Sequence, residues 1–195
     1  MAGKKTKEPL VVIVSAPSGS GKTTLVGRLL ETVPGIGRSV SYTTRKPRKD
    51  EVGQEDYIFI SKEEFKAKIE NGFLLEWENN FGNYYGTSIE QVENTLDKGE
   101  DIVLSIDVKG ARKVKKQYPE SISIFIMPPS EKKLEERLRK RNTDDEDEVI
   151  RRLKEAKTEM SSSDEYDFLI VNSEIEAAVL ELKAIIVQER ENYKK

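Results

Sequence analysis

The sequence contains neither cysteine nor histidine among its 195 residues. Without cysteine the chain can form no disulfide and offers no thiolate ligand to a metal ion. Without histidine it lacks the commonest general base and the imidazole ligand of zinc sites. These two absences exclude disulfide-linked folds, zinc sites built on cysteine or histidine, and any mechanism that needs a histidine base.

Long apolar runs and a large excess of one charge are also missing. No run approaches the roughly 20 apolar residues that a helix needs to span a bilayer, and the basic tail of residues 1–8 lacks the core of a signal peptide. The 33 basic and 36 acidic residues are mixed and give a net charge of −3, which argues against bulk electrostatic binding to nucleic acid. We expect a cytoplasmic protein of one compact domain, without nucleic-acid or membrane partners; no pattern defines its oligomeric state.

Near the N-terminus, an apolar β-branched run leads into a loop of small residues, and a helical pattern follows. Backbone N–H groups of such a loop form a cradle for an anion, with the positive end of the helix dipole behind them. Lys22 would reach the outer phosphates of a nucleotide, and the Thr23 hydroxyl would enter the shell of Mg²⁺. Ala16 stands where the full pattern has glycine, and a plain turn with a surface lysine is the alternative. The phosphate-binding candidates are Ala16, Pro17, Ser18, Gly19, Ser20, Gly21, Lys22, Thr23 and Thr24.

Buried apolar strands alternate with amphipathic helices along most of the chain, which predicts an α/β fold with a parallel sheet covered on both faces. Residues 38–87 differ, because short strands there flank a charged loop and a single short helix. We expect a core of about 9–37, 88–128 and 160–195, with an inserted strand-rich subdomain at about 38–87 and a helical hairpin at about 129–159.

Local signals predict where several elements begin and end. Capping boxes that start at Ser61, Ser88 and Thr143 each predict the N-terminus of a helix. The run Pro34-Gly35-Ile36-Gly37 predicts a break after the first helix. Ile122–Met127 is predicted to be a strand, and Phe168–Val171 is predicted to be a last buried strand.

The inserted segment carries the sharpest chemical candidates after the phosphate loop. Arg45 and Arg48, stiffened by the proline between them, can fork onto one phosphate, and Tyr57 and Tyr85 can add phenolic donors. A solvated basic loop is the alternative for the arginines. Glu76 falls within an apolar strand; it either faces solvent or accepts hydrogen bonds in a pocket. Guanine offers adjacent N1–H and N2–H donors that one carboxylate accepts together, whereas adenine has an acceptor at N1.

Taken in order, these motifs resemble those of the guanylate kinase family over residues 9–190. A phosphate loop alone occurs in many NTPases, so the arginine and tyrosine motif of the insert is the specific part. The stretches that carry the resemblance are Ala16–Thr23, Ser41–Arg48, Asp56-Tyr57, Glu76-Trp77, Gly82–Thr87, Ile106–Gly110 and Pro128–Ser130.

The resemblance implies a P-loop NTPase-type sheet with a GMP-binding insert and a helical lid, and transfer of the γ-phosphoryl group of ATP to GMP with Mg²⁺. ATP would bind the phosphate loop, with Asn172 beside the adenine, and Thr23 would contact the metal. The implied GMP-binding residues are Ser41, Arg45, Arg48, Tyr57, Glu76, Tyr85, Thr87 and Asp107. The implied catalytic residues are Lys22, Arg45, Arg137, Arg141 and Arg152.

Some features leave other interpretations open. The lid arginines could belong to an ordinary charged surface, and Asn172 could simply form a turn. Ser105 and Asn142 depart from the family, which commonly has an acidic residue and a glycine there. The rival functions are an inactive guanylate-kinase-like module that binds phosphopeptides, a kinase for another phosphorylated acceptor, and a switch GTPase.

Overall fold

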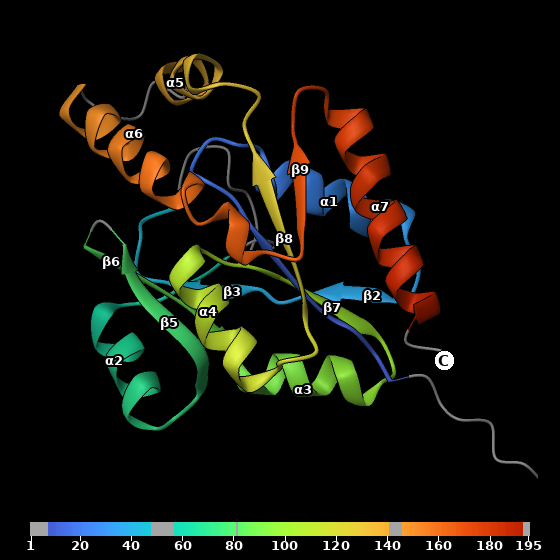
Figure 1. Cartoon of the computed structure of the whole chain (residues 1–195). Coiled ribbons are helices and arrows are strands. Elements are labelled where there is room, and N and C mark those ends of the chain that lie inside the picture. Colours follow the sequence, from blue (N-terminus) through green and yellow to red (C-terminus); the bar gives the residue numbers. More distant parts are fainter. Residues whose placement is uncertain (1–7, 48–56, 81, 141–145, 193–195) are drawn as a thin grey trace, which may run out of the picture.

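A computed structural model describes residues 8–47, 57–80, 82–140 and 146–192 of the chain. Its centre is a parallel sheet of five strands in the order β2-β7-β1-β8-β9 (Figure 1). Val12 of β1 pairs with Val103 of β7 on one side and with Ile122 of β8 on the other, so β1 lies in the middle. The predicted parallel α/β fold is therefore confirmed. The strands are β1 Val11–Ser15, β2 Ile36–Arg38, β7 Asp101–Ser105, β8 Ile122–Met127 and β9 Phe168–Val171.

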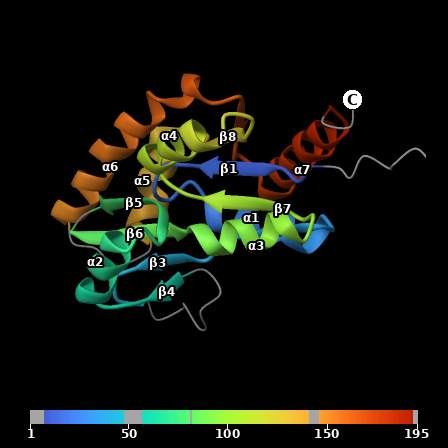
Figure 2. The ribbon, with the colours of Figure 1, turned by 90° about the horizontal axis from the view of Figure 1, so that it is seen from below.

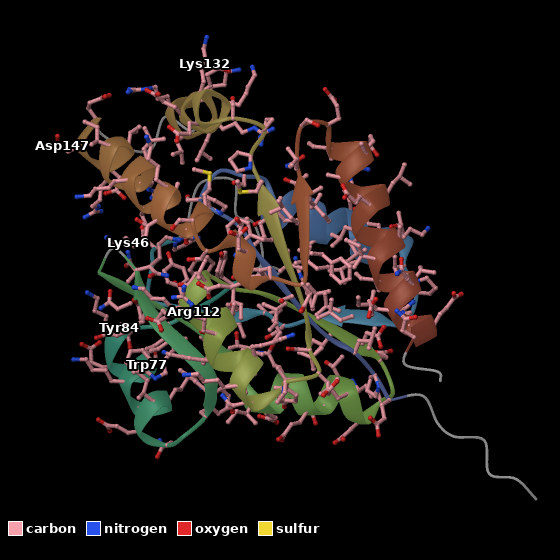
Figure 3. All side chains as sticks on the ribbon, viewed as in Figure 1. Lys46, Trp77, Tyr84, Arg112, Lys132 and Asp147 are labelled. Carbon is pink, nitrogen blue, oxygen red and sulfur yellow. The ribbon has the colours of Figure 1, made fainter. Side chains whose placement is uncertain are left out.

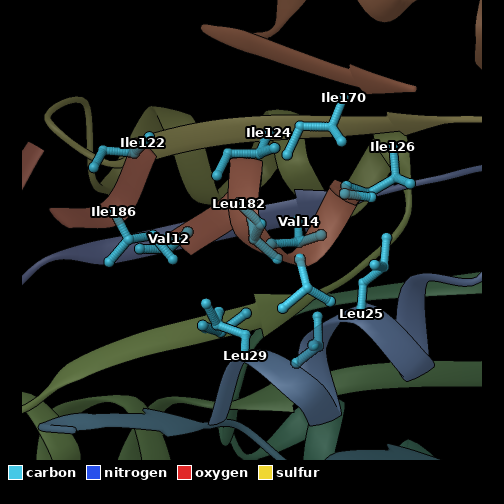
Figure 4. Close-up of a cluster of buried hydrophobic side chains, with 14 of the residues drawn as sticks. Val12, Val14, Leu25, Leu29, Ile122, Ile124, Ile126, Ile170, Leu182 and Ile186 are labelled. Atoms are coloured by element: carbon cyan, nitrogen blue, oxygen red, sulfur yellow. The ribbon is translucent and has the colours of Figure 1, made fainter. Parts of the chain in front are cut away.

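Helices cover both faces of this sheet because the side chains of each central strand point alternately to the two faces. On one face, Val12 and Val14 of β1 pack with Leu25 and Leu29 of α1 and with Leu182 of α7 (Figure 4). On the other face, the intervening residues of β1 pack with apolar residues of α3 and α4. The helices are α1 Lys22–Thr32, α3 Ile89–Asp97, α4 Val108–Gln117 and α7 Ile175–Asn192.

The inserted segment forms a second sheet of four strands in the order β4-β3-β6-β5, next to the main sheet (Figure 2). Helix α2 packs on it: Phe65 is fully buried and stacks on Tyr84 with ring centroids 5.3 Å apart. Trp77 and Tyr84 lie together on neighbouring strands of this sheet (Figure 3). The elements are β3 Ser41–Thr43, β4 Tyr57–Phe59, α2 Lys62–Glu70, β5 Leu74–Asn80 and β6 Asn83–Ser88.

A helical hairpin follows β8. Helices α5, Glu131–Lys140, and α6, Glu146–Met160, pack together through Leu134, Leu138 and Ala156. A short 3-10 helix, Ser163–Glu165, then leads to β9. No helix within the described ranges is both long and apolar enough to cross a membrane.

Several local expectations need correction. The predicted break at Pro34–Gly37 does follow α1, which ends at Thr32, but it also contains the start of β2, a strand that was not expected and that pairs with β7. The predicted last buried strand, β9, is the edge of the sheet: Ile170 is buried, but Leu169 and Val171 are each 49% exposed. The three-residue strand β2 and the edge position of β9 both depend on pairing with strands far away in the sequence. The local periodicity of side chains cannot predict such pairing.

The predicted capping boxes have different outcomes. The box at Ser61 forms in full. At Ser88 only half of it forms: the serine hydroxyl accepts from Gln91 N, but the Gln91 side chain accepts from Val40 N, 2.9 Å away. A tertiary contact has therefore replaced the local one. The box that starts at Thr143 lies outside the described residues.

Candidate active site

The predicted phosphate loop connects the carboxyl end of β1 to the first turn of α1. Gly19 and Gly21 have φ angles of +91° and +88°, a backbone conformation that residues with a Cβ rarely adopt. Ser20 N donates to Pro17 O at 3.1 Å and closes the turn. The N-terminus of α1 has neither a side-chain cap nor an acidic residue in its first turn. The positive end of this helix is thus available to a negatively charged ligand.

Lys22 is the first residue of α1 and lines a cavity in front of the loop. Its Nζ donates at 2.8 Å to the carbonyl of Ile106, the residue that follows β7. Burial lowers the pKa of Lys22, and the carboxylates of Asp107, Glu159 and Glu76 oppose this shift. The ammonium group therefore lies among a carbonyl and carboxylates. A phosphate bound at the loop can replace these acceptors.

Glu76 points into the same cavity from β5 and is only 6% exposed. One carboxylate oxygen, Oε1, accepts from the Thr87 hydroxyl at 2.6 Å. A Cβ on Gly110 would lie 2.7 Å from the other oxygen, so this glycine leaves room for the carboxylate. Burial raises the pKa of Glu76 to about 7, although the bond from Thr87 lowers it. This position agrees with the interpretation that Glu76 accepts hydrogen bonds in a pocket, and not with the alternative that it faces solvent.

Asp107 follows β7 and caps α4 through its Oδ1, which accepts from Gly110 N at 2.8 Å. Its other oxygen accepts a hydrogen bond from the side-chain amide of Asn80, at the end of β5. Asp107 thus joins the main sheet to the inserted sheet at the cavity. Sequence reasoning missed Asn80, because nothing local distinguishes it from a solvent-facing residue of the strand.

Aromatic rings surround Arg45 in the insert. Its guanidinium carbon lies 5.3 Å from the ring centroid of Tyr57 and 5.6 Å from that of Phe59, and Tyr57 meets Tyr85 edge to face. The Arg45 guanidinium also donates to Lys46 O at 2.7 Å. These contacts hold a cation and two phenols at one wall of the cavity, which differs from the solvated basic loop that was the alternative.

Other predicted residues lie around the cavity without lining it. Thr87 is fully buried, and its hydroxyl donates to Glu76. Asn172 is 1% exposed, and its amide donates to the carbonyl of Ser20 at 2.7 Å. Arg137 of α5 donates to the backbone oxygen of Asn172 at 3.3 Å. Arg48 and Arg141 lie outside the described residues.

The cavity brings together most of the residues that the sequence nominated. Those that line it are Ala16, Pro17, Ser18, Gly19, Gly21, Lys22, Thr23, Thr24, Ser41, Arg45, Tyr57, Glu76, Tyr85, Asp107 and Arg152. Sequence reasoning missed Glu155 and Glu159, which also line it. The spacing of these two glutamates from Arg152 was the available signal, since positions three and seven residues apart share one helix face. Burial raises the pKa of Glu159 to about 7, and Lys22 opposes that shift.

A family model described as guanylate kinase matches residues 8–189. The chain belongs to the guanylate kinase family.

Relatives and solved structures agree with this membership. A guanylate kinase of Shewanella violacea is 48% identical over 91% of this chain and 86% of its own length. A guanylate kinase of Geobacter metallireducens is 45% identical over 94% and 91%. The crystal structure of guanylate kinase from Anaplasma phagocytophilum matches with a TM-score of 0.80 and 36% identity, over 95% of this chain and 88% of that one.

Membership in the guanylate kinase family supports the catalytic interpretation over the inactive binding module. The relatives match over most of their own lengths and carry the kinase name. The phosphate loop with Lys22 and Thr23 is intact here apart from Ala16. The resemblance inferred from the motifs is therefore confirmed.

Proposed function

We propose that this guanylate kinase transfers the γ-phosphoryl group of ATP to GMP, forming ADP and GDP. One observation carries the proposal: the phosphate-loop lysine, Lys22, and the buried carboxylate of Glu76 face the same cavity. A phosphate cradle and a guanine-reading acceptor that line one cavity suit a nucleoside triphosphate and GMP bound end to end. With these two substrates, the proposed compartment is the cytoplasm.

Guanine selection rests on Glu76 in this proposal. Its carboxylate accepts from N1–H and N2–H of guanine, with Ser41 toward O6 and Asp107 toward N2. The resemblance also implied a contact of Thr87 with O6, but Thr87 is buried behind Glu76, so its proposed part is to hold that carboxylate. Adenine presents an acceptor at N1 and would leave the buried carboxylate without a donor there, which is costly. Arg45, Arg48, Tyr57 and Tyr85 are the proposed contacts of the GMP phosphate.

Phosphoryl transfer needs alignment and neutralisation of charge more than it needs a strong base. The GMP phosphate oxygen is already a nucleophile, so a chain without histidine can perform the reaction. Lys22, Arg45 and Arg152 provide cationic groups at the cavity, and Arg137 and Arg141 are the further candidates from the lid. These charges stabilise the oxygens of the group in transit.

Mg²⁺ is the proposed cofactor and would arrive with ATP. Within the described ranges, no group of three or more acidic residues could hold a metal ion by itself. The Thr23 hydroxyl at the cavity is a suitable oxygen donor, and the nucleotide phosphates would supply further ligands. When bound, the ion neutralises phosphate charge and orients the triphosphate.

The proposed division of the chain follows its chemistry. The core, about 9–37, 88–128 and 160–195, would bind ATP through the phosphate loop. The insert, about 38–87, would bind GMP, and the hairpin, about 129–159, would close over ATP. Closure excludes water, which would otherwise hydrolyse ATP.

An acceptor panel tests the proposed function. ADP release is measured with ATP, Mg²⁺ and either GMP, AMP, UMP or no acceptor. We expect fast release with GMP alone, and a loss of about 100-fold or more in Lys22→Ala, as for other lost electrostatic groups at active sites. Lys116→Ala, an exposed lysine of α4, is the matched control and should keep full activity. Equal rates with AMP, or with no acceptor, would refute the proposal.

A further inference from the structure

Asn172 stands at the carboxyl end of β9, and almost none of its surface reaches solvent. Its backbone N–H donates to Met127 O at 2.8 Å, which anchors the residue to the end of β8. Its side-chain Nδ2 donates to Ser20 O at 2.7 Å, across 152 positions of the sequence. The side chain is 1% exposed and does not line the cavity. The amide therefore faces the back of the phosphate loop.

The contact falls on the peptide unit between Ser20 and Gly21. Gly21 has a left-handed φ angle of +88°, and a glycine on one side lowers the cost of turning a peptide plane over. In a trans peptide the C=O and the N–H point in opposite directions. Holding the Ser20 carbonyl on Asn172 therefore holds the Gly21 N–H on the opposite side of the loop.

The fit between the two segments is tight. A Cβ on Gly21 would lie 2.5 Å from Asn172 Nδ2, so the amide occupies the space that the glycine leaves. Only the NH₂ group can donate to a carbonyl, and this determines which way the amide faces. Asn172 Oδ1 is buried and has no hydrogen-bond partner among the described residues. The hydrogen bond from Nδ2 to Ser20 O thus fixes the orientation of the buried Asn172 amide against the loop.

The lid helix reaches the same residue. Arg137 of α5 donates to the Asn172 backbone oxygen at 3.3 Å. The side chains of Leu134 and Leu138, also on α5, would lie 3.1 to 3.3 Å from a Cβ on Gly19. Asn172 is therefore placed where the loop, the end of the sheet and the lid helix meet.

We propose that Asn172 is a positioning residue: its amide locks the Ser20–Gly21 peptide in the orientation that binds phosphate. The inference deepens the proposed kinase function, and it assigns Asn172 to polyphosphate affinity instead of contact with adenine. An adenine contact was the expectation from the family resemblance. The two roles make opposite predictions for a ligand that has phosphates and no base.

The test compares ATP with inorganic tripolyphosphate, both with Mg²⁺, by calorimetric titration of the wild type, Asn172→Ala and Asn172→Ser. Loss of the amide leaves a buried carbonyl without its donor, and we expect both ligands to bind about tenfold more weakly in Asn172→Ala. The KM for ATP should rise by a similar factor while the KM for GMP stays constant. Asn172→Ser, a smaller change, should lose affinity for both ligands in equal proportion. Unchanged GMP affinity shows that each variant is folded.

Three results would overturn the inference. Weaker binding of ATP with unchanged binding of tripolyphosphate would assign Asn172 to the base. Unchanged binding of both ligands would show that Asn172 does not contribute to ATP binding. Failure of the wild type to bind tripolyphosphate would show that the loop does not cradle phosphate in this way. These titrations need no turnover, so their outcome is separate from that of the acceptor panel.

Discussion

Glu76 is a carboxylate whose surroundings favour its protonated form. Its pKa is about 7 in the folded protein against an ordinary value of 4.5, chiefly because of burial. The proposed guanine contact needs the ionised form, so GMP binding must release a proton near neutral pH. We expect the Kd for GMP to rise by about tenfold from pH 8 to pH 6. Calorimetry in two buffers with different heats of ionisation measures the proton release.

The variant Glu76→Gln is the control for this titration. In this variant the Kd for GMP still depends on the ionisation of the GMP phosphate, whose second pKa is about 6. The part of the pH dependence that comes from the Glu76 carboxylate should disappear. The variant should also lose the preference for GMP over AMP. Because the folded-state pKa is raised, this site stabilises the wild type below pH 4.5, and that stability is lost as the pH rises to about 7. A wild-type Kd independent of pH after correction with Glu76→Gln would contradict the proposed contact.

Gly110 offers a second prediction at the scale of single residues. In Gly110→Ala the new Cβ would lie 2.7 Å from Glu76 Oε2, so the carboxylate must move. We expect the KM for GMP to rise severalfold while the melting temperature stays within about 3 °C of the wild type, because alanine favours a helix by about 1 kcal/mol over glycine.

Gly27 supplies the matched control for this substitution. It also lies within a helix, α1, and nothing lies within 4 Å of where its Cβ would be. Gly27→Ala should therefore leave the KM for GMP unchanged and raise the melting temperature. Equal kinetic effects of the two substitutions would refute the role assigned to Gly110.

At the scale of elements, the last helix is joined to the sheet by a buried charge. Asp101, at the start of β7, is buried; its Oδ1 accepts from Leu10 N at 2.8 Å and its Oδ2 from Arg190 Nε of α7 at 2.6 Å. Removing the cation from a buried pair costs about 3 kcal/mol, because the remaining charge stays out of water. Arg190→Met should destabilise the fold by that amount in urea, with kcat unchanged.

Arg28 of α1 supplies the comparison for this element. It faces Glu31 at 3.9 Å with both side chains more than half exposed, and such surface pairs contribute little to stability. Arg28→Met should therefore change the free energy of unfolding by less than about 0.5 kcal/mol. If Arg190→Met were equally mild, the link between α7 and β7 would not contribute to stability as inferred.

At the scale of the whole molecule, three parts of the chain face one cavity. Lys22 comes from the core, Tyr57 from the insert and Arg152 from the lid hairpin. Two nucleotides bound between them should draw the insert and the hairpin inward. A compact chain of this length has a radius of gyration of about 16 Å, and we expect ADP with GMP to lower it in small-angle X-ray scattering. ADP with CMP should not, and an unchanged radius with both cognate nucleotides would contradict closure.

Much of this architecture follows from patterns that any single segment carries. The run Val11–Val14 predicts a buried strand because its β-branched side chains need cover on both faces, and the glycines after it predict a loop whose backbone N–H groups bind an anion. The run Ile122–Met127 matches β8 residue for residue. By contrast, β2 has only three residues and no periodicity of its own, and its pairing with β7 makes it a strand.

The candidate site divides in the same way. The types and spacing of Lys22, Thr23 and Arg45 nominated them before any fold was known. The contacts of Asn80 and Asn172 could not be nominated, because an asparagine in a strand or after one is ordinary locally. Their partners, Asp107 and Ser20, lie far away in the sequence.

By itself, the sequence determined the chemistry that this protein has available: a glycine-bent anion cradle, a lysine, arginines and one carboxylate in an apolar strand, with no histidine or thiol. The tertiary structure alone decided that Glu76 is buried facing that cradle and that an amide from the end of β9 holds the loop from behind. The physical reason is range. Backbone preference and side-chain periodicity act over a few residues, whereas burial, pKa and directed hydrogen bonds depend on which distant segments the sheet brings together.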